Sequence, residues 1–74
     1  MMETETVLDL QVNGARESLP VATIAALLDH KGVDAARKGI AVALNGAVLP
    51  RARWAEHRLA SGDAVEIIQA KQGG

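Results

Sequence analysis

The chain has 74 residues, of which eight are lysine or arginine and nine are aspartate or glutamate, so its formal net charge is −1 at pH 7. This balance argues against nucleic acid or an anionic membrane as a partner, and the single aromatic residue, Trp54, provides no set of rings for base stacking. Because cysteine is absent, a disulfide framework, a thiolate nucleophile and a cysteine-based zinc site are excluded, and a chain of this length predicts one small domain.

The start of the chain predicts a cytoplasmic protein that opens with a β-hairpin. Residues 1–6 are acidic and polar, where a secretion signal would be basic and then apolar, and no apolar run approaches the roughly 20 residues of a membrane helix. Residues 7–12 alternate apolar and polar side chains, which is typical of a half-buried strand. Asn13-Gly14 then favours a type I′ turn, since both residues tolerate a positive φ, and a second strand is expected at 15–19.

A short helix is expected after this hairpin. Thr23 is suited to the N-cap, and Ile24, Leu27 and Leu28 recur at the spacing that places one apolar stripe on a helix. Gly32 is suited to ending the helix, because a left-handed residue commonly follows a helix C-terminus. A polar connector then leads into the second half of the chain.

The second half predicts three more strands, at residues 40–44, 48–49 and 65–70. A second Asn-Gly pair, Asn45-Gly46, favours a tight turn between the first two of them, and Pro50 ends the short strand. Residues 51–58 are consistent with one irregular or helical turn, and 61–63 with a turn into the last strand. One helix packed across one face of a mixed sheet buries these apolar residues economically, so we expect an α+β fold.

Alternation assigns each side chain of the last strand to one of two faces. Val65 and Ile67 are expected to face the helix. The opposite face should then present a flat, weakly apolar patch, consisting of Glu66, Ile68 and Ala70 from the last strand and Ala41 and Ala43 from its neighbour. With Ile68 at its centre, this patch is a candidate partner interface, and the alternative is a merely solvated sheet face.

The chain ends in Gly73-Gly74, which predicts a tail made for insertion into another protein. Glycine has no Cβ, so the last residues can pass through a narrow channel and present an ionised carboxylate at its far end. We therefore expect a domain at 1–70 and a flexible tail at 71–74, with Gln72 and Gly73 inserted and the Gly74 carboxylate as the reacting group. The alternative, from the dipeptide alone, is a frayed end with no task.

The remaining polar residues give no sign of a catalytic or metal site. His30 and His57 lie far apart in the sequence and have no cysteine or neighbouring histidine, so surface histidines are favoured. A basic cluster around Arg51 and Arg58 could contact a phosphate or an acidic partner, but a solvated turn whose Trp54 covers the edge of the core is favoured. With no nucleotide-binding glycine loop either, we expect no enzyme activity, no metal and no bound cofactor.

A set of segments in the second half of the chain has a specific order and spacing. The set comprises residues 42–51 (Val-Ala-Leu-Asn-Gly-Ala-Val-Leu-Pro-Arg), Trp54, Leu59, Gly62-Asp63, Val65-Glu66-Ile67 and Gly73-Gly74. In these segments the chain resembles the ThiS family, the bacterial sulfur carriers of thiamine synthesis. The resemblance is specific from Ile40 to Gly74, whereas the first half matches in pattern only. It implies a ubiquitin-like β-grasp fold, in agreement with the order of elements.

The resemblance also implies that the chain is a protein cosubstrate and not an enzyme. A ThiF-type enzyme would use ATP to adenylate Gly74, sulfur from a cysteine desulfurase would convert the adenylate to a thiocarboxylate, and the thiazole synthase ThiG would receive that sulfur. The alternatives are a MoaD-type molybdopterin or tRNA-thiolation carrier, a ubiquitin-like modifier that joins Gly74 to lysine, and an interaction domain whose tail has no task. The segment Leu49-Pro50-Arg51 followed by Trp54 favours the thiamine type.

Overall fold

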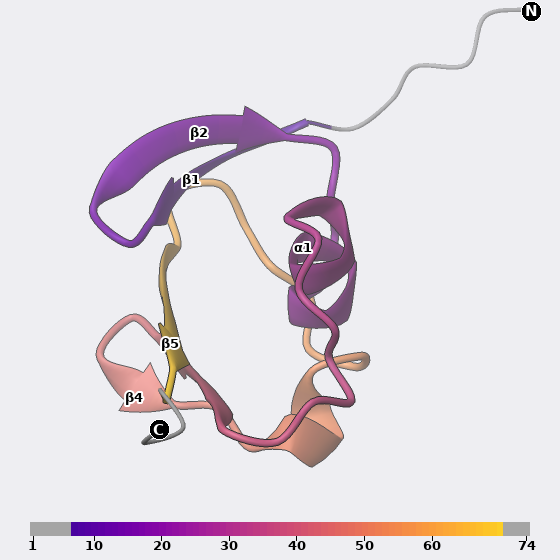
Figure 1. The fold of residues 1–74 in the computed structure, drawn as a ribbon. Coiled ribbons are helices and arrows are strands. Elements are labelled where there is room, and N and C mark those ends of the chain that lie inside the picture. The colour runs from indigo at the N-terminus through magenta and orange to yellow at the C-terminus, as the bar shows by residue number, and fades with distance from the viewer. Residues whose placement is uncertain (1–6, 71–74) are drawn as a thin grey trace, which may run out of the picture.

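The structure is a computed structural model that describes residues 7–70. Within this range lie five strands, one α-helix and one short 3-10 helix (Figure 1). In chain order these are β1 (Leu8–Val12), β2 (Ala15–Leu19), α1 (Ile24–His30), β3 (Ile40–Leu44), β4 (Ala47–Val48), η1 (Arg51–Arg53) and β5 (Ala64–Gln69). In the described range, no helix has the length and apolar character needed to cross a bilayer.

The strands form one mixed sheet in the order β2-β1-β5-β3-β4. The pairs β1–β2, β3–β4 and β3–β5 are antiparallel, whereas β1 and β5 run parallel, with Gln11 opposite Ala64 and Val12 opposite Val65. The last strand of the chain therefore occupies the middle of the sheet. Figure 1 shows α1 on one side of this sheet, which confirms the expected α+β arrangement of one helix on one face.

The core lies between α1 and the sheet. The predicted apolar stripe of the helix is wholly buried, since Ile24, Leu27 and Leu28 expose none of their surface. The sheet contributes the nearly inaccessible side chains Leu10, Val42 and Val65. Six further apolar residues complete the buried cluster: Val12, Leu19, Val21, Ile40, Trp54 and Leu59. Burial of the helix stripe against alternate strand residues is the main source of stability in a domain of this size.

Both Asn-Gly turns form as predicted, and each asparagine also contacts the central strand. The φ angles are 51° at Asn13 and Asn45, and those of the following glycines are positive as well. The side-chain oxygen of Asn13 accepts the amide of Ile67 at 2.8 Å, and that of Asn45 accepts the amide of Ala64 at 2.9 Å. The two turns thus satisfy amides of β5 that the strand pairing leaves free, a role that the turn chemistry alone did not predict.

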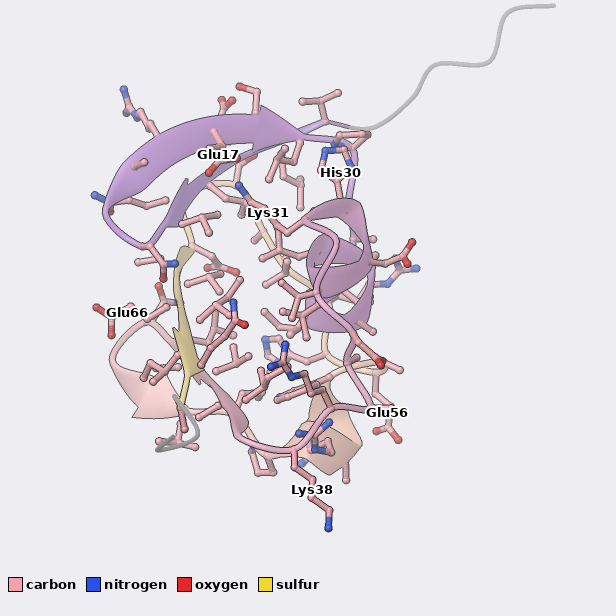
Figure 2. All side chains as sticks on the ribbon, viewed as in Figure 1. Glu17, His30, Lys31, Lys38, Glu56 and Glu66 are labelled. Atoms are coloured by element: carbon pink, nitrogen blue, oxygen red, sulfur yellow. The ribbon has the colours of Figure 1, made fainter. Side chains whose placement is uncertain are left out.

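The helix has the predicted ends. Thr23 is the N-cap, with extended backbone angles and a side-chain oxygen that accepts the amide of Ala26 at 3.1 Å. At the other end, the chain turns away at Gly32, whose φ is 77°. Lys31 then pairs with Glu17 of β2 at 2.5 Å (Figure 2), which joins the end of α1 to the edge of the sheet.

Two strands differ by one residue from their predicted positions. β4 covers 47–48 and not 48–49, because the Leu49 carbonyl accepts the indole N–H of Trp54 at 2.9 Å and the next residue, Pro50, has no N–H to donate. β5 covers 64–69 and not 65–70, because Ala64 already pairs with β1. The expected irregular or helical turn at 51–58 is the 3-10 helix η1 followed by hydrogen-bonded turns.

Candidate functional site

The inserted segment and reacting group expected from the sequence, Gln72, Gly73 and Gly74, lie outside the described residues. The structure does describe Ala70, the residue from which this tail departs, and we call Ala70 the tail root. Its amide donates to the carbonyl of Gly39 at 2.7 Å, just beyond the last pair of the β3–β5 ladder. The tail root therefore lies at the end of β5, the central strand of the sheet.

Gly39 has the backbone conformation that lets it hold the tail root. Its φ is 84°, in the left-handed region that side-chain-bearing residues rarely adopt. A Cβ at this position would also lie 3.6 Å from the Cβ of Ala70, an ordinary contact, so the backbone angle rather than crowding favours glycine here. The sequence analysis treated this residue only as the end of a connector.

The sheet face opposite the helix carries the predicted patch. The register places Ala41 opposite Ile68 and Ala43 opposite Glu66, as expected. Ile68 is 53% exposed, whereas Val65 is buried and Ile67 packs against the core, so the predicted assignment of β5 side chains to two faces is confirmed. Figure 2 shows Glu66 pointing away from the helix side of β5. Whether a partner binds this face stays a prediction.

One residue of this face was missed from the sequence. Val48 of β4 pairs with Ala43, so it lies on the same face of the sheet, and it is 76% exposed. The register of the Asn45-Gly46 hairpin could have revealed it, since a two-residue turn places residue 48 opposite residue 43. We define the outer patch as Ala41, Ala43, Val48, Glu66 and Ile68. Val48 makes the outer patch more apolar than the sequence analysis expected.

The other half of the same face is polar, which limits the outer patch to β5, β3 and β4. In the β1–β2 hairpin, Asp9 pairs with Ser18 and Gln11 with Arg16. The Ser18 hydroxyl donates to the Asp9 carboxylate at 2.6 Å. The apolar half therefore lies on β5, β3 and β4. Gly39 directly precedes β3 and Ala70 directly follows β5, so the tail root lies beside the two longer strands of the outer patch.

Two residues of the basic segment near η1, Trp54 and Arg51, make structural contacts. Trp54 is only 3% exposed, as expected for a residue that covers the edge of the core. The Arg51 guanidinium lies over its ring, 4.5 Å from the centroid, and donates to the carbonyls of Ala35 and Arg37. All three arginines, Arg51, Arg53 and Arg58, are exposed, but the guanidinium of Arg51 also bonds to the backbone of the domain.

The described range contains no group of three or more histidine, aspartate or glutamate side chains that could hold a metal ion. His30 ends α1 and His57 follows η1, and both are exposed. The structure thus brings together the outer patch and the tail root, and it leaves the two histidines in separate surface positions.

A mixed sheet with a parallel central pair, one helix on one face and a tail leaving the central strand defines a ubiquitin-like β-grasp domain. The family model of ThiS matches residues 10–74. The chain therefore belongs to the ThiS family of small sulfur carriers.

Comparison with solved structures also supports membership of the ThiS family. The crystal structure of the thiamine biosynthesis protein ThiS from Geobacter metallireducens is 33% identical, covers 90% of this chain and 100% of its own, and superposes with a TM-score of 0.73. The solution NMR structure of a thiamine biosynthesis protein from the same organism is 33% identical, covers 90% of this chain and 88% of its own, and gives a TM-score of 0.74. A search of curated proteins found no match. The expected β-grasp fold and family are thus confirmed.

Proposed function

We propose that this chain is the sulfur carrier for thiazole formation in thiamine synthesis, with the Gly74 carboxylate as the group that carries sulfur. The observation that supports this most strongly is the match to the ThiS family, which extends through the tail to residue 74. The two similar structures from Geobacter metallireducens, both thiamine biosynthesis proteins, support the thiamine assignment over other pathways. The composition favours the cytoplasm as the place where this occurs.

The chemistry begins with a carboxylate that cannot transfer its acyl group, because the leaving group would be oxide. A ThiF-type enzyme removes this barrier: a Gly74 oxygen attacks the α-phosphorus of ATP, pyrophosphate leaves, and an acyl adenylate forms. The terminal sulfur of a persulfide, supplied ultimately by a cysteine desulfurase, then displaces AMP to form an acyl disulfide, and a thiol reductant cleaves its S–S bond to leave the sulfur on Gly74. The resulting thiocarboxylate is a soft nucleophile that ThiG accepts as its sulfur source. The carrier needs no cofactor of its own, since the partner consumes the ATP.

The geometry of the domain suits a carrier whose tail is modified in the active site of a partner enzyme. Five extended residues from Ala70 to Gly74 span about 16–18 Å, which lets the carboxylate enter a buried site while the domain stays outside. The outer patch lies on β5, which ends at the tail root, on β3, which begins beside it, and on β4, so a partner that covers the patch is well placed to receive the tail. We propose that the outer patch, with Ala70 at its end, is the surface on which the adenylating enzyme docks.

Replacing Ile68 by Asp tests this docking surface. A buried carboxylate at the centre of an apolar contact should raise the KM of the adenylating enzyme for the carrier by about tenfold to a hundredfold, with little change in kcat. The fold should survive, because Ile68 is half exposed in the free domain. Steady-state adenylation kinetics measure KM and kcat, and a thermal melt of the variant measures whether the fold survives.

Val7→Asp is the matched control, since Val7 is 49% exposed but precedes β1, away from the outer patch. It should leave KM within about twofold of the unaltered chain. If Ile68→Asp has no larger effect than Val7→Asp on KM and on thiocarboxylate yield, the outer patch is not the docking surface.

The thiazole assignment is tested by offering the thiocarboxylated carrier to different acceptors. We expect thiazole formation with ThiG and its small-molecule substrates, and no sulfur transfer to a molybdopterin synthase subunit or a tRNA-thiolating enzyme. Sulfur transfer to only one of these two alternative acceptors would assign the carrier to the pathway of that acceptor and not to thiamine synthesis. Linkage of Gly74 to lysines of other proteins would instead identify a ubiquitin-like modifier.

A further inference from the structure

Residues 33–39, which make up most of the segment between α1 and β3, form no helix or strand, and we call them the connector. Its internal support is local: the amide of Ala36 bonds to the Asp34 carboxylate at 3.0 Å, and the amide of Arg37 to the Asp34 carbonyl at 3.0 Å. Figure 2 shows Lys38 extending away from the body of the domain. The second half of the connector therefore needs an anchor from elsewhere in the fold.

That anchor is Arg51. Its two terminal nitrogens donate to different carbonyls of the connector, one to Ala35 and the other to Arg37, the latter at 2.9 Å. Its guanidinium plane rests on Trp54, which is itself buried and bonded to the Leu49 carbonyl. A planar fork with fixed donors can hold two carbonyls at once, which a lysine ammonium at the same place does less well.

The connector in turn holds the tail root. Two residues after the carbonyl of Arg37, the carbonyl of Gly39 accepts the amide of Ala70 at 2.7 Å. The position of that carbonyl depends on the left-handed backbone of Gly39, and hence on where the preceding residues are held. The Arg51 side chain is thus linked to the tail root through residues 35–39. Hydrogen bonds join Arg51 to this stretch of backbone, and a further hydrogen bond joins the stretch to Ala70.

We propose that Arg51 is a positioning residue for the tail: by fixing the connector it fixes the tail root, and so sets the direction in which the terminal carboxylate leaves the sheet. This inference rests on the proposed function, because it assigns Arg51 a role in presenting Gly74 to the adenylating enzyme. Docking and presentation then belong to different residues. The outer patch determines how tightly the domain binds, and Arg51 determines how often a bound domain has its tail inserted.

Kinetics of Arg51→Met separate these two roles. Methionine keeps an apolar stem on Trp54 but removes both donors to the connector. Releasing one backbone residue at the tail root should reduce the productively inserted fraction about fivefold to thirtyfold. The adenylation kcat should fall by that factor while KM stays within about twofold, the reverse of the split expected for Ile68→Asp. Arg51→Lys should retain most of the defect, since it keeps the charge without the fork.

Arg53→Met is the matched control, because Arg53 belongs to the same turn, is exposed and has no side-chain hydrogen bond within the described residues. It should match the unaltered chain in kcat and KM. Equal kcat for the Arg51→Met variant and the unaltered chain would overturn the inference, as would full recovery in Arg51→Lys, which would show a charge effect only.

Amide hydrogen exchange in the free carrier tests the same link without any enzyme. In Arg51→Met the amide of Ala70 should exchange at least about threefold faster, while those of Val42 and Val65 in the core keep their rates. An unchanged Ala70 rate, or a uniform rise that includes the core, would overturn the inference. If the unaltered chain is not adenylated at all, the proposed function fails, an outcome distinct from adenylation with equal kcat in both proteins.

Discussion

A chain that lacks Gly74 should lose adenylation and every later step. The shortened tail still ends in a glycine carboxylate, but its reach is smaller by about 3.3–3.6 Å. A reacting atom must lie within about 0.5 Å of its productive position, so a loss of reach this large should lower the rate below detection. ATP–pyrophosphate exchange by the adenylating enzyme measures this first step directly, before any sulfur donor is needed.

Two controls separate reach from residue identity. A chain without Gln72 keeps Gly73-Gly74 but is equally short, so it should be as inactive as the chain without Gly74. Gln72→Ala keeps the length and should remain active. Full adenylation without Gly74 would contradict the requirement for reach, whereas an interaction domain whose tail has no task would not be adenylated at either tail length.

Replacing Trp54 by Ala should cause the largest loss of stability of any single change in the described domain. The indole is nearly fully buried, bonds to the Leu49 carbonyl and supports the Arg51 guanidinium. Large-to-small changes at such positions reduce the free energy of unfolding by about 3–5 kcal/mol. A small domain has about 5 kcal/mol in all, at the low end of the usual range, so much of the population should be unfolded. Urea denaturation followed by circular dichroism measures the change.

Trp54→Phe provides the graded comparison. It keeps an aromatic ring in the core and under Arg51 but leaves the Leu49 carbonyl without its donor, so a loss of about 1–3 kcal/mol is expected. If Trp54→Ala cost less than Trp54→Phe, the assignment of Trp54 as a structural residue of the core would be wrong.

The parts of the fold that sequence reasoning predicted are those with local determinants. Both hairpins follow from Asn-Gly pairs, whose positive φ angles are a property of two adjacent residues. The helix follows from Thr23, an apolar stripe and Gly32, all within ten positions. The two faces of β5 follow from alternation, and this was sufficient to place Glu66 and Ile68 on the exposed side.

The parts that were missed depend on contacts between residues distant in the sequence. Asn13 bonds to Ile67 across 54 positions, and Arg51 bonds to the connector across 14 and 16. A turn asparagine and an arginine in a polar segment have no local feature that reveals such partners. The role of Gly39 is hidden for the same reason, because its partner, the tail root, lies far along the chain at the end of β5.

For the candidate site, the sequence indicated the reacting group, and the structure described the residues that surround the tail root. Only the composition of the tail could indicate Gly74, since those residues lie outside the described range. The structure adds Val48 to the outer patch and links the tail root to Gly39. Under the proposed function, these additions assign docking to the outer patch and positioning of the tail to the residues around the tail root.

Intact-mass spectrometry tests the central claim most directly. The purified chain is incubated with ATP, its adenylating enzyme, a cysteine desulfurase, cysteine and a thiol reductant, and the mass is compared with that of a sample lacking ATP. We predict an ATP-dependent gain equal to one oxygen replaced by one sulfur, localised by fragmentation to Gly74. An unchanged mass in the presence of an adenylating enzyme that is active on its own carrier, or a gain located elsewhere in the chain, would contradict the account.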